Sequence, residues 1–298
     1  MRTFNKINLF ILFVITTFVI IIPTYASADA IIGEPVVTLG KDLTGTQQDA
    51  ILEEMQVPAG VKIIEVTNEE EHQYLGQYIS RATIGTKAIS SAKITLTDSG
   101  TGISVKTNNI TDITENMYSN AAITAGIKDA DIYVTAPFRV SGTAGLTGII
   151  KAFETATGKK IDENQKQVAN EEIVRTSDVA KEIGDPNKAV QFMNSIKEKI
   201  ATENPQTPEE HKDIIINVAN EFNINLNQKT IDQLVKFSQN YSSLNIDWDQ
   251  LKSQLESFRG NINNTLNSEQ TQGIIDKILD GLRGILQVIS NKLSELLH

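Results

Sequence analysis

The sequence DIYVTAPFRVSGTAGLTG, at residues 131–148, joins a predicted strand to a predicted helix through a turn of glycine and small hydroxyl residues. Residues 131–134 form the predicted strand, and the helix is entered near Leu146. Glycine allows close approach of the backbone to its neighbours, which suits a tight junction of this kind. A strand that leads into a helix is the building unit of sheets covered by helices, so we expect such a sheet here.

Similar units precede this junction along the chain. Two helices begin with a capping box, in which a Thr side chain and a Gln or Glu three residues later satisfy free backbone amides. The boxes pair Thr44 with Gln47 and Thr67 with Glu70. The order of predicted elements is β-α-β-α-β-β-α-β, which indicates a mixed sheet with covering helices. Strands are predicted at residues 34–39 and 61–66, and helices from residue 44, from 67 to 79 and over 114–127.

Residues 93–97 and 102–106 alternate apolar and polar side chains on either side of Asp98-Ser99-Gly100-Thr101. Alternating segments around a short Asp- and Gly-containing turn predict a β-hairpin. The string D-S-G-T also occurs in aspartic proteases, but those enzymes need two such aspartates and the chain has one copy. A turn is therefore the interpretation that we adopt.

The second half of the chain is predicted to be helical throughout. Two of its helices begin with proline at the first helical position, at Asp185-Pro186 and Thr207-Pro208. The predicted fold class is therefore α+β. A mixed α/β sheet domain would cover residues 29–150 and an all-helical domain residues 151–298, with a linker near 155–160. The predicted helices cover residues 161–173, 186–200, 208–222, 228–241, 248–266 and 274–297.

The first 28 residues have the order of a secretory signal peptide. Arg2 and Lys6 precede an apolar run over residues 9–22, and Ala26-Ser27-Ala28 follows it. The run is shorter than the ~20 residues that span a bilayer, which makes a retained membrane anchor the weaker alternative. We therefore expect cleavage after Ala28 and a secreted, extracytoplasmic protein of the cell envelope.

The chain is acidic and has no cysteine, with a formal net charge of −10 over 298 residues. This charge argues against nucleic acid as a partner, because phosphate backbones require basic patches. Without cysteine there is neither a disulfide framework nor a site for lipid attachment. His72, His211 and His298 are isolated in the sequence, so we expect neither a metal site nor a cofactor.

The turn at residues 141–148 is the leading candidate for a ligand site. Backbone amides at the start of a helix attract anions, so a phosphate, sulfate or carboxylate could dock at this turn. The spacing G-x-x-G-x-x-G matches no nucleotide pattern, which favours the other interpretation, a tight turn whose small residues pack on the sheet. The residues of this predicted anion site are Ser141, Gly142, Thr143, Gly145 and Gly148.

No complete catalytic set is present in the sequence. Ser90 and Lys93 have the S-x-x-K spacing of penicillin-binding enzymes, but the partner motifs S-D-N and K-T-G do not occur. A wall-acting hydrolase that uses carboxylates stays open as an alternative. It would need two carboxyl groups across a cleft, drawn from residues 69–71, Asp98 and Asp131.

The last predicted helix, at residues 274–297, places a row of Ile and Leu on one face. Its other face carries acidic and basic residues in balance, whereas membrane-lying helices usually have a basic face with aromatic anchors. Docking in the helical bundle or in a homo-oligomer is therefore favoured over contact with lipid. The predicted contact residues are Ile275, Leu279, Leu282, Leu286, Leu293 and Leu297.

Several stretches resemble the YpuA-like family of secreted proteins from Gram-positive bacteria. They are VVTLGKDLTGTQ (36–47), VTNEEEHQYLGQYI (66–79), IGTKAISSAKIT (84–95), the segment 121–154 and NIDWDQ (245–250). The family is defined by a domain of unknown function and has no assigned reaction. The resemblance implies export and a role in envelope homeostasis or in the stress response to wall damage, and it transfers no catalytic residues.

These observations together predict a secreted or envelope-associated binding protein without enzymatic activity. Its partner would be an envelope component, namely a protein, a wall polymer or the membrane surface. The carboxylate-dependent hydrolase and the anion-binding module at residues 141–148 are the alternatives.

Overall fold

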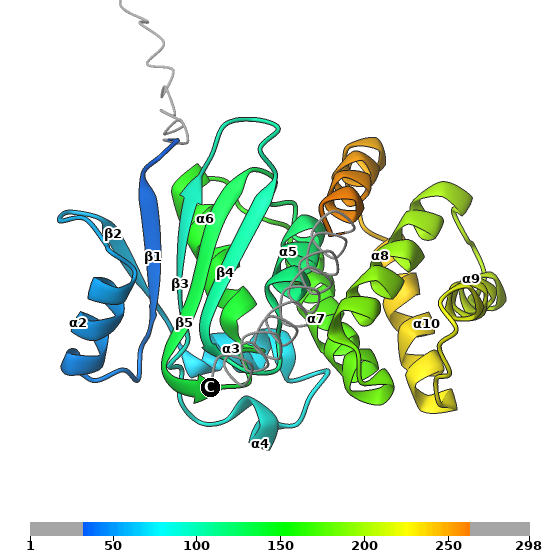
Figure 1. Ribbon diagram of the computed structural model, residues 1–298, viewed down its shortest axis with the longest axis horizontal. Helices are drawn as coiled ribbons and strands as arrows, with labels where there is room; N and C mark the ends of the chain where they lie inside the picture. The colour runs from blue at the N-terminus through cyan, green and yellow to red at the C-terminus, as the bar shows by residue number, and fades with distance from the viewer. Residues whose placement is uncertain (1–31, 263–298) are drawn as a thin grey trace, which may run out of the picture.

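The computed structural model describes residues 32–262 of the chain. The predicted leader with its cleavage site and the predicted amphipathic helix at residues 274–297 lie outside the described residues. The described part contains a five-stranded mixed sheet with helices on both faces, followed by a group of helices (Figure 1). The predicted α+β fold class is confirmed.

The strands and most of the helices start close to the predicted positions. None of the helices within residues 32–262 combines the length and apolar composition that a membrane crossing requires. The strands are β1 (Pro35–Gly40), β2 (Lys62–Val66), β3 (Ser91–Leu96), β4 (Ile103–Ile110) and β5 (Ala130–Val140). The helices are α2 (Gly45–Glu54), α3 (Asn68–Leu75), α4 (Arg81–Ile84), α5 (Glu115–Thr124), α6 (Gly145–Thr157), α7 (Glu163–Ile183), α8 (Pro186–Glu203), α9 (Pro208–Glu221) and α10 (Gln228–Ser242), and residues 248–262 are also helical.

The strand order in the sheet is β2-β1-β3-β5-β4. The pairs β1–β2 and β4–β5 are parallel, and β3 is antiparallel to both β1 and β5. Four strands therefore run in one direction, and their carboxyl ends meet at the same edge of the sheet. We call this edge the carboxyl edge; in open α/β sheets it is where ligands usually bind.

The predicted hairpin of β3 with β4 is wrong, because β5 lies between the two strands. The turn at residues 98–101 exists, but it crosses over the start of β5 instead of joining paired strands. Asp129, the residue before β5, holds it: its carboxylate Oδ1 accepts hydrogen bonds from the amides of Gly100 (3.0 Å) and Gly102 (2.8 Å). Insertion of β5 buries the apolar side chains of Ile132 and Val134, which a free hairpin would leave partly exposed.

Alternating residues of the strands face two different helical layers. Val37 and Leu39 of β1 pack with Ile51 and Met55 of α2 on one face of the sheet. The opposite face is covered by α5 and α6 (Figure 1). Because side chains alternate along a strand, a strand buried on both faces needs apolar residues in consecutive positions, as Val36 and Val37 of β1 show.

A hydrophobic cluster continues from the sheet into the helical part of the chain. It includes Ile94 and Val134 of the sheet, Met117 of α5, Phe192 of α8 and Phe237 of α10. In Figure 1, α7 to α10 are stacked beside the sheet on the side of α5. The predicted division into two domains at residue 150 stays a prediction; residue 150 lies within α6.

A fully buried lysine connects α8 to α5 and α7. The Lys197 Nζ lies 2.7 Å from Glu172 Oε1 of α7 and 2.7 Å from Asn120 Oδ1 of α5. It also reaches the Thr124 hydroxyl at 3.0 Å and the Asn120 carbonyl at 3.1 Å. Lys197 is 0% and Glu172 1% exposed, so the ammonium group depends entirely on these oxygen partners.

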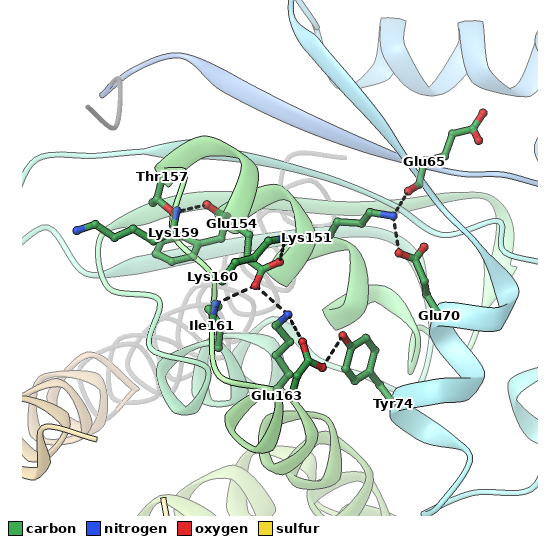
Figure 2. Close-up of polar contacts among 12 residues, drawn as sticks. Glu65, Glu70, Tyr74, Lys151, Glu154, Thr157, Lys159, Lys160, Ile161 and Glu163 are labelled. Atoms are coloured by element: carbon green, nitrogen blue, oxygen red, sulfur yellow. Dashed lines mark hydrogen bonds and ion pairs between the residues drawn. The ribbon is translucent and has the colours of Figure 1, made fainter. Parts of the chain in front are cut away.

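A second set of ion pairs links α3, α6 and α7, and is drawn in Figure 2. Glu154 of α6 accepts from Lys166 of α7 at 2.8 Å, and Lys166 also pairs with Glu163 at 2.7 Å. Burial opposes ionisation of Glu154, but the bond from Lys166 and the Ile161 amide hold its pKa below the usual value. The Tyr74 hydroxyl donates to Glu163 at 3.1 Å and so attaches α3 to α7.

Two helix ends differ from the predicted ones by four residues or more. Helix α3 ends at Leu75 instead of continuing to residue 79, because Gly76 follows and Ser80 caps the next helix, α4. Helix α7 continues to Ile183, ten residues beyond the predicted end, because its buried apolar stripe extends through Val179. The end of α3 has a local cause, whereas the length of α7 depends on partners that are distant in the sequence.

Replacement of Lys197 by methionine is expected to lower the free energy of unfolding by about 3–5 kcal/mol, because Glu172 is then left buried without a cation. The double variant Lys197→Met/Glu172→Leu should recover much of this loss, since it removes both charges. Urea unfolding followed by circular dichroism measures both. A double variant no more stable than Lys197→Met would contradict the assignment of the loss to the unpaired carboxylate.

Candidate functional site

A cavity of about 350 Å³ opens at the carboxyl edge of the sheet. Three segments surround it: α3, the loop at residues 83–90 between α4 and β3, and residues 140–144 between β5 and α6. We call it the carboxyl-edge cavity. Its polar lining comes from hydroxyl side chains, from one carboxyl group and from Lys87 at an exposed position.

The turn after β5 is held by a buried tyrosine. The Tyr118 hydroxyl of α5 donates a hydrogen bond to the carbonyl of Gly142, and Tyr118 is 0% exposed. Gly142 has a φ of +88°, and a Cβ there would lie 2.3 Å from Ile110 Cγ2. Only glycine satisfies both demands, so this position is set by backbone conformation and by packing.

The structure separates the residues of the predicted anion site into two groups. Ser141, Gly142 and Thr143 line the carboxyl-edge cavity. Gly145 and Gly148 lie instead in the packing of α6 on the sheet, where a Cβ would meet Tyr118 Oη at 2.5 Å and Thr38 Oγ1 at 2.8 Å. The three-residue spacing of these glycines is therefore accounted for by close contacts, and anion binding at the turn stays a prediction.

The acidic run at the start of α3, from which the hydrolase alternative would draw a carboxyl group, has three different environments. Glu69 is exposed. Glu70 completes the capping box with Thr67 and pairs with Lys151 at 2.5 Å (Figure 2). Glu71 is only 2% exposed and lines the carboxyl-edge cavity, where Asn68 Nδ2 donates to its Oε2 at 3.0 Å.

Burial raises the pKa of Glu71 to about 7, and the nearby negative charges of Asp42 and Glu70 add to this effect. The hydrogen bond from Asn68 opposes the shift without cancelling it. Near neutral pH the carboxyl group is therefore present in both protonation states. Such a group can donate a hydrogen bond to a ligand or accept one from it.

Other groups in the cavity are also available for hydrogen bonds. Within the described residues, the side-chain hydroxyls of Thr86 and Ser90 have no hydrogen-bond partner, and Ser141 and Thr143 bond only to each other, at 3.3 Å. Hydroxyl groups donate and accept, so the lining suits a ligand that carries hydroxyls of its own.

The carboxylates considered for a hydrolase do not come together. Asp131 lies at the start of β5, and Asp98 lies in the turn that crosses it, at the edge opposite to Glu71. The length of β3 separates the two edges, which corresponds to roughly 15–20 Å. Among the described residues that line the carboxyl-edge cavity, Glu71 is the one carboxyl group.

The S-x-x-K pair is also split by the fold. Ser90 lines the carboxyl-edge cavity, whereas the Lys93 ammonium group donates to the Met55 carbonyl at the end of α2. Lys93 therefore has no part in activating Ser90. In residues 32–262 no three His, Cys, Asp or Glu side chains are grouped so as to hold a metal ion.

A family described as "Protein of unknown function (DUF1002)" matches residues 39–258, which include the sheet, the carboxyl-edge cavity and α7 to α10. The chain belongs to this family. It is 42% identical over 264 residues to the "Uncharacterized protein YpuA" of Bacillus subtilis (strain 168), with 88% of this chain and 90% of that protein covered. No solved structure matches the chain.

The predicted membership of a YpuA-like family is thus confirmed. The family is described as one of unknown function, so the match assigns no activity. Glu71, the carboxyl group of the carboxyl-edge cavity, was named from the sequence only as one of three neighbouring acidic residues and was not distinguished from Glu69 and Glu70. The signal that was available is the spacing of Glu71 and Leu75, which four residues apart share one face of α3, and Leu75 is 0% exposed.

The elevated pKa of Glu71 predicts a pH-dependent loss of stability. An unfolded glutamate titrates near 4.3, so folding favours the protonated form, and this contribution is lost as pH rises through about 7. Glu71→Gln should therefore gain about 2–3 kcal/mol relative to wild type between pH 5 and pH 8. Urea unfolding at several pH values measures the difference.

Glu69→Gln, which removes a charge from the exposed side of the same helix, is the matched control. A titration of the labelled Glu71 carboxyl carbon by NMR gives the pKa directly. A midpoint below 5 would show that the site is hydrated or paired in a way that the described contacts do not include.

Proposed function

We propose that this protein is exported from the cytoplasm and acts as a non-enzymatic binding protein that holds a small hydroxylated ligand beside Glu71. The observation that carries the proposal is one buried carboxyl group, with a pKa near neutrality, in a cavity whose other polar side chains are hydroxyl groups and Lys87. Ligand pockets of this kind combine an apolar wall with few polar groups that fix orientation. Leu75 and Ile89 supply apolar wall here.

The chemistry of the lining favours a sugar-like ligand. Thr86 and Ser90 each offer a donor and an acceptor, and Glu71 offers either role according to its protonation state. A dianion is less well matched, because an ionised Glu71 would repel it and Lys87 supplies the one basic side chain of the lining. An anion on the Ser141–Thr143 turn is nevertheless the second candidate, and the experiment below separates the two.

Binding is favoured over hydrolysis because glycoside cleavage needs two carboxyl groups that face each other across the bond. Asp42 is near enough to Glu71 to raise its pKa, but its carboxylate Oδ2 accepts a hydrogen bond from the Ala88 amide at 2.8 Å. Asp42 holds the loop before β3 in this way and does not line the cavity.

The proposed location outside the cytoplasm rests on the leader at residues 1–28. We further propose that the amphipathic segment at residues 274–297 attaches the protein to an envelope component or to a second copy of the chain. A binding role in envelope homeostasis is consistent with such an attachment.

The ligand proposal predicts that N-acetylglucosamine binds to the purified protein and that the double variant Thr86→Val/Ser90→Ala weakens binding at least tenfold. Two lost hydrogen bonds of about 1 kcal/mol each account for this factor. Isothermal titration calorimetry measures the dissociation constants. Ser104→Ala, which removes an exposed hydroxyl from β4, is the matched control and should bind as wild type does.

A parallel titration with inorganic phosphate distinguishes the candidate ligands. The anion site is the correct alternative if three results are found together: phosphate binds, the sugar does not bind, and Lys87→Gln weakens phosphate binding. If neither compound binds at 10 mM, the carboxyl-edge cavity is not a site for either class and the ligand proposal is wrong.

Export predicts that the mature chain begins at Asp29 and is absent from the cytosol. Fractionation of cells into medium, wall, membrane and cytosol, followed by mass spectrometry of the N-terminal peptide, tests this. A cytosolic protein that still begins at Met1 would contradict export without affecting the ligand proposal.

A further inference from the structure

A second cavity, of about 280 Å³, lies between the end of α3, α7 and α10. It shares no lining residue with the carboxyl-edge cavity. Gln77 and Tyr78 come from the turn after α3, Gln167 and Arg175 from α7, and Lys236 from α10. We call it the α7–α10 cleft.

Arg175 is the central charged group of the α7–α10 cleft and is only 6% exposed. Its guanidinium pairs with Glu171 at 3.4 Å and with Asp178 at 3.5 Å, which is longer than a good charge-assisted hydrogen bond. The Nε atom of Arg175 is buried and has no hydrogen-bond partner in the described part of the chain. A buried donor without a partner is costly, so a ligand that supplies an acceptor would be favoured here.

The orientation of Arg175 is set before any ligand arrives. Its guanidinium carbon lies 5.6 Å from the centre of the Tyr78 ring, within the range of a cation–π contact. Burial, with the nearby Glu171 carboxylate, raises the pKa of Tyr78 to about 12, so the phenol stays protonated and can donate. A guanidinium that already rests over an aromatic ring loses less entropy on binding an oxyanion than a free one does.

The amide groups around Arg175 are available. Within residues 32–262, no hydrogen bond engages the side-chain amides of Gln77, Asn164 or Gln167. An amide offers one acceptor and two donors, which matches the N–H and C=O groups of a peptide. Asn240 is already used, because its Nδ2 donates to Glu171 Oε2 at 2.9 Å.

The charge balance of the α7–α10 cleft is positive at its surface. Arg175 and Lys236 line it, and no carboxylate is among its lining residues. Glu171 is 0% exposed and lies behind Arg175, with its two oxygens bonded to Arg175 and Asn240. Asp178 is partly exposed and lies 3.5 Å from Nη1 of Arg175. The lining of the cleft therefore combines two cationic side chains with several side-chain amides.

We propose that the α7–α10 cleft binds the free carboxylate end of a short peptide. Arg175 and Lys236 neutralise the carboxylate, and Gln77, Asn164 and Gln167 pair with the neighbouring peptide groups. Arginine in a fixed plane suits a carboxylate because its donors match the two oxygens. An inorganic anion has no N–H group, so it would leave the side-chain carbonyls of Gln77, Asn164 and Gln167 without a hydrogen-bond donor. The site is independent of the carboxyl-edge cavity and of export.

The test uses N-acetyl-alanyl-alanine and its C-terminal carboxamide, titrated into the full-length protein by calorimetry. The acid is expected to bind at least tenfold more tightly than the carboxamide, because only the acid meets Arg175 and Lys236 with a charge. Lys236→Gln should weaken binding of the acid about threefold, as expected for an exposed cation. Lys229→Gln, an exposed charge change at the start of the same helix, is the matched control.

Arg175→Lys keeps a positive charge beside Glu171 but removes the planar donors, and should weaken binding of the acid at least tenfold. If this variant fails to fold, as judged by circular dichroism, Lys236→Gln and Gln167→Leu carry the test. Equal affinity for acid and carboxamide would overturn the proposal, as would binding of inorganic phosphate as tightly as the acid. No binding of either peptide at 10 mM would also overturn it.

Discussion

The structure depends on an ammonium group that has been removed from water. Lys197 of α8 is acceptable in the interior only because Glu172 of α7 and the oxygens of Asn120 and Thr124 of α5 surround it. These partners come from both halves of the chain, so α8 can occupy one position relative to α5. Since α5 packs on β4 and α7 on α5, this position places the helical part against the sheet.

The shape of the carboxyl-edge cavity depends on the same packing of α5, α7 and α8. Tyr118 of α5 reaches the carbonyl of Gly142, so the helix that contacts Lys197 also holds the turn after β5. On the other side, the ion pair of Lys151 with Glu70 holds α3 against α6, and the hydrogen bond from Tyr74 to Glu163 holds α3 against α7. Glu71 is therefore buried by helices placed elsewhere, and its elevated pKa is a consequence of packing.

The two cavities differ in the way that their polar groups are used. The carboxyl-edge cavity has one ionisable group of adjustable charge among hydroxyls, which suits a neutral hydroxylated molecule. The α7–α10 cleft has two cations among amides, which suits an anionic end with peptide groups beside it. Among the described residues, neither cavity is lined by the pair of carboxyl groups that glycoside cleavage requires.

Much of the local structure was determined by the sequence itself, because its signals act within one turn of chain. The capping boxes at Thr44 and Thr67 and the proline starts of α8 and α9 were predicted correctly, and the strands start close to their predicted positions. The strands β4 and β5 continue four and six residues beyond their predicted ends. Tertiary structure alone decided that β5 separates β3 from β4, and that Glu71 is buried while Glu69 is exposed. Strand pairing and burial depend on contacts between residues far apart in the chain. The free energy of such contacts cannot be predicted from any short segment of the sequence.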